Sequence, residues 1–203
     1  EISCSLVGSE MCIRDRYIGR ADYPLTMDSI SSLRNIKAKY HYPEVQAVFT
    51  SPLKRCTESA DIMFPKNNPI VINDFIEYNF GEFEECTAKD LENNEDFIKW
   101  IRGDMNSRPP YGESNAEFTH RVCDAFEKVV DGLIKTQTET AAIVGHAGVL
   151  MTILACYGLP EAPMAHWQMD PGYGFKLRIT PSLWMRANKL EVADTAPEST
   201  REE

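Results

Sequence analysis

The sequence of 203 residues lacks the features that mark several specialised classes of protein. No run approaches the ~18 consecutive apolar residues that a membrane-spanning helix needs. Acidic residues outnumber basic ones by 31 to 21, and the net charge of −10 argues against a broad nucleic-acid or anionic-membrane surface. Neither a glycine-rich nucleotide motif nor a metal-ligand spacing of His, Cys or Asp is present. We therefore expect no cofactor, no metal, and neither nucleic acid nor membrane as a partner.

Cysteine pairing patterns are also missing. The six cysteines form no Cys-x-x-Cys and have no regular spacing, and we recognise no secretory signal. We therefore expect reduced thiols in a cytoplasmic protein. What the sequence does contain is apolar residues, 43% of the total, which suffices for the core of one domain of this length.

The first sixteen residues, EISCSLVGSEMCIRDR, differ from the rest. They begin without Met and show no helical or strand periodicity. Residues 6–16 resemble the translation of a common transposase-based sequencing adapter, so we expect a non-native leader that has replaced the true N-terminus and must be left out of fold reasoning. The expected organisation is a leader over 1–16, one domain over 17–184 and a polar tail over 185–203.

Strands and helices alternate along the remaining chain. Short apolar runs predict strands at 45–49, 69–72, 141–144 and 175–179. Helical spacing and capping residues predict helices at 26–40, 51–63, 91–101, 114–133 and 148–156, with a capping box at Ser114 and Glu117. This alternation is typical of a three-layer α/β fold, a mainly parallel sheet with helices on both faces.

Two expected strand-to-helix junctions carry residues suited to chemistry. Arg55 follows the first strand, near the N-terminus of a helix for which Ser51 is the expected N-cap, and could hold an anion such as phosphate. His146 lies between Gly145 and Ala147 at a later strand end, where it could be a base, a nucleophile or a charge partner. The alternatives remain a surface arginine on a solvated helix and a purely structural histidine.

An aromatic and acidic loop over 75–85 is the third feature. A carboxyl group such as that of Glu77, held against apolar groups, has a raised pKa and can serve as a general acid. The alternative is a solvated acidic loop. His41, His120 and His166 lack any such context, and we interpret them as structural.

Taken in order, five segments resemble the histidine phosphatase superfamily, which has the phosphoglycerate-mutase-like fold. They are YIGRADYPLT (17–26), TSPLKRCTESA (50–60), IEYNFGEFE (76–84), PYGESNAEFTHR (110–121) and VGHAGVLM (144–151). The resemblance is strongest to the bacterial α-ribazole-phosphatase-like branch. It implies that Arg55 binds the phosphoryl group, His146 neutralises it, and Glu77 acts as proton donor and then as base. It also implies a substrate mouth lined by Ile18, Gly19 and Ala147.

One departure from the family pattern matters. The family carries a nucleophilic histidine in an Arg-His-Gly signature on its first strand, and the usual spacing places that signature at Ser5-Leu6-Val7. The later Arg14-Asp15-Arg16 is out of register and lacks histidine. We therefore expect a chain that lacks the nucleophile and the first, central strand, with negligible activity as written.

The resemblance implies a phosphomonoester hydrolase that acts on a small phosphorylated metabolite through a phosphohistidine. The short segment between the Glu77 loop and residues 112–114 favours a phosphatase over the alternative, a phosphoglycerate-type mutase. A second alternative is a non-catalytic pseudophosphatase that binds anions through Arg55 and His146.

Overall fold

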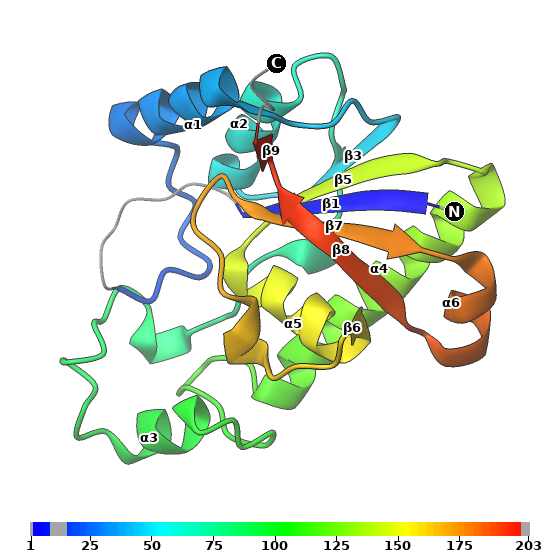
Figure 1. Ribbon diagram of the computed structural model, residues 1–203. Coiled ribbons are helices and arrows are strands. Elements are labelled where there is room, and N and C mark those ends of the chain that lie inside the picture. Colours follow the sequence, from blue (N-terminus) through cyan, green and yellow to red (C-terminus); the bar gives the residue numbers. More distant parts are fainter. Residues whose placement is uncertain (1, 9–15, 200–203) are drawn as a thin grey trace.

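The computed structural model describes residues 2–8 and 16–199, which form a seven-stranded mixed sheet between two layers of helices (Figure 1). The strand order is β4-β3-β5-β1-β7-β8-β6. The strands of this sheet are β1 (Ile2–Gly8), β3 (Ala47–Thr50), β4 (Ile70–Val71), β5 (Thr140–Gly145), β6 (Gly158–Leu159), β7 (Gly174–Ile179) and β8 (Leu190–Ala196). Separately, β2 (Tyr40–His41) pairs with β9 (Glu198–Ser199).

Helices cover both faces of the sheet. The helices are α1 (Met27–Lys39), α2 (Lys54–Met63), α3 (Glu95–Ile101), α4 (Asn115–Thr136), α5 (Ala147–Tyr157) and α6 (Pro181–Ala187), with short 3₁₀ turns η1 (Asn73–Phe75), η2 (Gly81–Phe83) and η3 (Met164–Trp167). In Figure 1, α1 and α2 lie above the sheet and α4, α5 and α6 below it. No helix within the described residues is both long and apolar enough to cross a membrane.

The central strand β5 shows why the fold has three layers. Its side chains alternate between two buried clusters, with Ala141 and Ile143 facing the α4 and α5 side, and Ala142 and Val144 facing the α1 and α2 side. A strand buried on both faces requires helices on both faces. The predicted three-layer α/β class is confirmed, and the sheet is mainly parallel apart from β7, which runs antiparallel to both neighbours.

The expectation that the chain lacks a first central strand is wrong. Residues 2–8 form β1 in the middle of the sheet, parallel to β5 and antiparallel to β7. Ile2 and Cys4 are buried, with 5% and 1% exposure. A ladder needs backbone groups and small or apolar side chains, and these residues supply both. Whether residues 6–16 derive from an adapter stays a prediction, and 9–15 lie outside the described residues.

The expected polar tail after residue 184 is also wrong. Residues 190–196 form β8, which pairs antiparallel with β7. Leu190 and Ala196 at its ends are buried, whereas Glu191 and Asp194 face solvent. The polar composition that predicts a tail belongs to the exposed face of a strand.

Helix boundaries follow local signals with one exception that affects the site. Thr26 caps α1, and Ser114 with Glu117 forms the predicted capping box of α4. By contrast, α2 begins at Lys54 with Leu53 as its N-cap, so Ser51 is not the cap. The Ser51 hydroxyl is directed to His146 instead.

Candidate active site

The two predicted junctions meet at the carboxyl ends of β3 and β5. These strands run parallel, with Thr50 opposite Val144, so the turns that follow them lie side by side. Strand β1 ends at the same edge, where Gly8 is opposite Gly145. Such an edge of a parallel sheet is where α/β proteins place their ligands.

Arg55 stands at the start of α2 and is only 2% exposed. Its Nε donates to Nδ1 of His146 at 3.2 Å, and its two terminal nitrogens donate to the carbonyls of Ala21 at 2.7 Å and Gly19 at 2.8 Å. Burial lowers the pKa of the guanidinium, and nearby acidic groups, Glu77 among them, oppose that shift. Arg55 is therefore a buried cation fixed by hydrogen bonds, and not a solvated surface arginine. The three bonds use three of its five N–H donors.

His146 occupies the N-cap position of α5 and is 3% exposed. Its Nε2 lies 2.7 Å from the Ser51 hydroxyl, and the Cys56 sulfur is 3.4 Å from the same nitrogen. Burial, followed by the positive charges of Arg55, Arg121 and Arg20, holds its pKa well below the usual value. Since Arg55 donates to Nδ1, we assign the neutral form with its proton on Nε2. An arriving dianion would raise that pKa and allow the ring to carry charge.

Glu77 lies beside the same helix end. Its carboxylate accepts hydrogen bonds from the backbone N–H groups of Tyr78 at 2.8 Å and Gly148 at 3.2 Å. A Cβ on Gly148 would come within 2.6 Å of Glu77 Oε1, so the approach depends on glycine at that position. Burial raises the pKa of Glu77, and the two backbone bonds and the Arg55 charge only partly offset the shift. A buried carboxyl group with a raised pKa can deliver a proton.

The loop of residues 18–21 is clamped between two side chains. Glu84 accepts the backbone N–H groups of Gly19 at 2.8 Å and Ala21 at 3.1 Å, while Arg55 binds the carbonyls of the same two residues. Gly19 also packs against the 78–80 segment, where a Cβ would lie 2.0 Å from the Tyr78 carbonyl oxygen. This clamp fixes the loop over the guanidinium.

The three residues expected to line the substrate mouth differ in how accessible they are. Ile18 is buried, with 8% exposure. Gly19 has both backbone groups bonded within the protein, and Ala147 is exposed at the first position of α5. A role for each in substrate binding stays a prediction.

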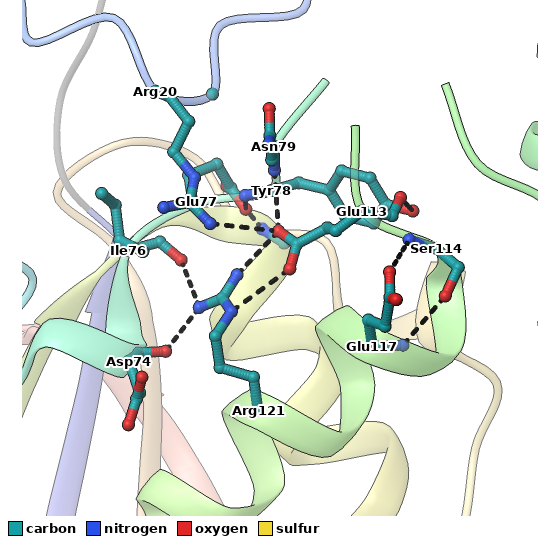
Figure 2. A network of polar contacts seen from close by, with 12 residues as sticks. Arg20, Asp74, Ile76, Glu77, Tyr78, Asn79, Glu113, Ser114, Glu117 and Arg121 are labelled. Carbon is teal, nitrogen blue, oxygen red and sulfur yellow. Dashed lines mark hydrogen bonds and ion pairs between the residues drawn. The ribbon is translucent and has the colours of Figure 1, made fainter. Parts of the chain in front are cut away.

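Figure 2 shows a second network, centred on Glu113, that supports the Glu77 segment. Arg121 donates to both carboxylate oxygens of Glu113, at 2.8 and 3.3 Å, and Arg20 reaches the same carboxylate at 3.4 Å. Through its remaining nitrogen, Arg121 donates to the carbonyls of Asp74 and Ile76 at 2.6 and 2.9 Å. These bonds fix the backbone immediately before Glu77.

Four of these supporting residues were not predicted from the sequence to act in the site: Ser51, Glu84, Glu113 and Arg121. Each lies in one of the segments that resemble the family, but its role depends on partners distant in the chain, and no local spacing marks it. The other three histidines, His41, His120 and His166, are exposed, so His146 is the one histidine that the described residues bring to this site.

Within the described part of the chain, no cluster of three or more His, Cys, Asp or Glu side chains could hold a metal ion. The five cysteines described there are thiols and not disulfide partners. The arrangement combines a buried cation, a neutral histidine and a protonatable carboxyl group. It is therefore suited to bind a phosphoryl group and to protonate a leaving alcohol.

Comparison with known proteins agrees with this chemistry. A family model described as "Histidine phosphatase superfamily (branch 1)" matches residues 9–186. The fold is similar to that of an α-ribazole phosphatase from Shigella flexneri, at 21% identity over 100% of both chains with a TM-score of 0.80. It is also similar to a putative α-ribazole-5′-P phosphatase from Escherichia coli (strain K-12 substrain MG1655), at 22% identity over 99% of both chains with a TM-score of 0.80. No curated protein matches the chain significantly.

Proposed function

Because the chain belongs to the histidine phosphatase superfamily, we propose that its site is built to hydrolyse phosphomonoesters of a small metabolite through a phosphohistidine intermediate. The observation that carries the proposal is the convergence of Arg55, His146 and Glu77. Arg55 contacts His146 directly, and Glu77 contacts the helix end two residues beyond it.

In this proposal Arg55 binds the phosphoryl oxygens through charge-assisted hydrogen bonds. His146 binds the same group and gains a proton as the dianion raises its pKa. A nucleophilic histidine attacks phosphorus, the bond from phosphorus to the ester oxygen breaks, and Glu77 gives that oxygen its proton. Glu77 then takes a proton from water, which attacks phosphorus and releases phosphate and the histidine.

We further propose that the chain as written has negligible phosphatase activity, because it has no nucleophilic histidine. Family spacing assigns Ser5, Leu6 and Val7 to the Arg-His-Gly signature. These residues lie on β1, opposite Ala142, Ile143 and Val144 of β5, the strand that leads to His146. The family spacing would put the nucleophilic histidine at Leu6, and a leucine side chain cannot attack phosphorus.

The likeness to α-ribazole phosphatases makes an α-ribazole 5′-phosphate the first candidate substrate. We also place the protein in the cytoplasm, because its cysteines show no pairing pattern in the sequence.

The test compares three chains: the chain as written, a graft with Ser5→Arg, Leu6→His and Val7→Gly, and a matched graft that carries Leu6→Ala instead. We expect the histidine graft to release phosphate from p-nitrophenyl phosphate at least about a thousand times faster than either control, since loss of a nucleophile has effects of that order or larger. The histidine graft should also form an acid-labile phosphorylated protein, detected by intact mass. Equal turnover in all three chains would overturn the proposal.

A non-catalytic anion-binding module is the second candidate, and the absence of the signature histidine favours it. Such a module would bind inorganic phosphate through Arg55 in the chain as written, and the histidine graft would remain inactive. Sequencing the source DNA across codons 1–16 distinguishes the enzyme from the binding module. Authentic Arg-His-Gly codons upstream indicate an enzyme, and their absence indicates a binding module.

A further inference from the structure

Two cysteine thiols meet where α4 packs against α5, away from the candidate active site. Cys123 lies in the first half of α4 and Cys156 near the C-terminal end of α5, and both pack against the hydrophobic core. Their side chains are hydrogen-bonded to each other. Cys156 comes nine residues after the start of α5, which is about 14 Å along the helix axis at the usual rise per residue. The pair is therefore separate from His146, which precedes that helix.

Contacts beside the two thiols hold α4 and α5 together. The hydroxyl of Tyr157, the residue after Cys156, donates to Glu127 Oε1 at 2.8 Å. The Tyr157 ring also packs against that of Phe126, with ring centroids 5.4 Å apart. Phe126 and Glu127 follow Cys123 by three and four residues, so all three lie on one face of α4. Because these contacts fix the two helices, the thiols stay next to each other without a covalent bond.

A fixed cation lies beside Cys156. Lys189 Nζ donates to the backbone carbonyl of Cys156 at 3.2 Å and forms an ion pair with Glu161 at 2.8 Å. The hydrogen bond from Cys123 lowers the pKa of the Cys156 thiol, and the charge of Lys189 adds to that shift against the opposing effect of burial. The same hydrogen bond raises the pKa of Cys123. Cys156 is therefore the thiol that ionises first.

Solvent access distinguishes the pair from two of the other thiols. Cys4 and Cys56 are 1% and 0% exposed, whereas Cys123 and Cys156 are half-buried, so a small oxidant has access to the pair. Cys86 is also half-buried, and its sulfur contacts the backbone carbonyl four residues earlier at 3.6 Å. Cys86 is thus a thiol of similar exposure that can serve as a matched control.

We propose that Cys123 and Cys156 form a reversible disulfide when a hydroperoxide oxidises the pair, at a modification site independent of the proposed phosphatase reaction. The Cys156 thiolate attacks one peroxide oxygen and the O–O bond breaks. The other oxygen takes a proton from solvent and leaves as water or an alcohol, and Cys156 becomes a sulfenic acid. Cys123 then attacks the Cys156 sulfur, the S–O bond breaks, and the leaving hydroxide takes the Cys123 proton to form water. The two thiols lose two electrons, which the peroxide gains.

The test treats the reduced full chain with hydrogen peroxide, blocks the remaining thiols by alkylation, and maps cross-linked peptides by mass spectrometry. We expect a chain lighter by two hydrogen atoms, in which Cys123 and Cys156 are cross-linked, and full recovery of both thiols with dithiothreitol. Cys86→Ser should form the same disulfide at an unchanged rate. Lys189→Gln should slow its formation several-fold, because it removes the cation beside the attacking thiol.

Single-cysteine variants test the order of the two steps. In Cys123→Ser the reaction should stop at the sulfenic acid of Cys156, which dimedone traps. In Cys156→Ser the dimedone adduct of Cys123 should form at least about tenfold more slowly, because the Cys123 thiolate is disfavoured. Equal rates of adduct formation in the two variants would overturn the assignment of Cys156 as the attacking thiol.

Three further results would overturn the disulfide itself. The first is a chain that keeps both thiols in excess peroxide while Cys86 is oxidised. The second is a peptide map that joins a different pair of the six cysteines. The third is a disulfide between Cys123 and Cys156 that forms only in urea, which would show that the folded helices do not bring the thiols together. None of these results bears on phosphate release by the histidine graft, so the proposed function is tested separately.

Discussion

The neighbouring strands β1 and β5 differ in what each contributes to the molecule. They run parallel, pair residue by residue, and both end in Val-Gly. After β5 comes His146, the residue around which Arg55 and Ser51 are arranged. The segment of β1 to which we assign the family signature reads Ser-Leu-Val, without a histidine. Under the proposed function, β5 therefore supplies structure and leads to a site residue, whereas Ile2–Gly8 supply structure alone.

The difference arises because a strand and a site make different demands on sequence. Every residue except proline offers the N–H and C=O that a ladder needs, so many small and apolar sequences can fill a central strand. A nucleophile requires one side chain at one position. A foreign or altered segment can thus complete the sheet while it leaves the site without its reactive group.

Cys4→Asp tests the structural role of β1 and has the largest expected effect on stability. Cys4 is 1% exposed at the centre of the sheet, and burial raises the pKa of its thiol to about 12. An aspartate there would bury a carboxyl group without a partner, and we expect the free energy of unfolding to fall by about 3–5 kcal/mol, enough to unfold a marginally stable domain.

Urea unfolding measures this loss, with Cys4→Ala as the matched control, for which we expect a loss of only about 1 kcal/mol. If both variants unfold at the same urea concentration as the unaltered chain, residues 2–8 do not form the central strand.

Glu113→Gln tests how much the ion pairs of Glu113 contribute to stability. Glu113 is bonded to Arg121 and Arg20, and its side chain is only 13% exposed. Loss of the charge would leave the largely buried Arg121 guanidinium without its ion-pair partner, and we expect about 2 kcal/mol of destabilisation. The control is Glu44→Gln, in an ion pair with Lys66 where both side chains are about four-fifths exposed; there we expect no measurable change in stability, because solvent screens the pair.

The Glu113 network also predicts a consequence for the site. Because Arg121 holds the backbone carbonyls before Glu77, Glu113→Gln in the histidine graft should lower kcat and alter the acid limb of its pH profile. Glu44→Gln should alter neither. If both variants lose equal stability and keep the same pH profile, Glu113 is an ordinary surface carboxylate.

Features set by local sequence could be predicted, and features set by distant partners could not. The start of α4 follows from a capping box over residues 114–117, and its buried face follows from an apolar stripe along a single helix; both are confirmed. Glu113 lies directly before that capping box, but one of its partners, Arg20, is 93 residues away. Strand β8 has buried residues at its two ends with acidic residues between them, so its place depends on pairing with β7.

The approximate location of the site was predictable for a related reason. Strand ends of a parallel sheet meet at one edge, so Arg55 and His146 could be brought together from their positions after two apolar runs. The place of Glu77 depends on a loop whose path is fixed by Arg121 and by the glycine at position 148. Only the family resemblance, and no spacing in the sequence, singled it out among the carboxylates of that loop.

The last prediction concerns pH and distinguishes two buried groups whose pKa values are shifted in opposite directions. The pKa of His146 is held well below its usual value, chiefly by burial. Below about pH 6.5 the unfolded chain therefore gains a proton at this residue that the folded protein does not. As the pH is lowered further, the free energy of unfolding decreases by up to about 1.4 kcal/mol per pH unit. Burial raises the pKa of Glu77, so its contribution has the opposite sign: stability falls as pH rises from about 4.5 through the folded pKa.

Urea unfolding from pH 4.5 to 7.5 distinguishes the two groups when it is repeated on single variants. His146→Gln should remove the loss of stability below pH 6.5, and His120→Gln, at an exposed histidine, should leave it in place. Glu77→Gln should make the protein more stable at neutral pH, because it removes the cost of a buried charge. If the slope below pH 6.5 is the same in His146→Gln as in the unaltered chain, His146 is not a buried neutral group. The Arg55 contact would then not be its resting state.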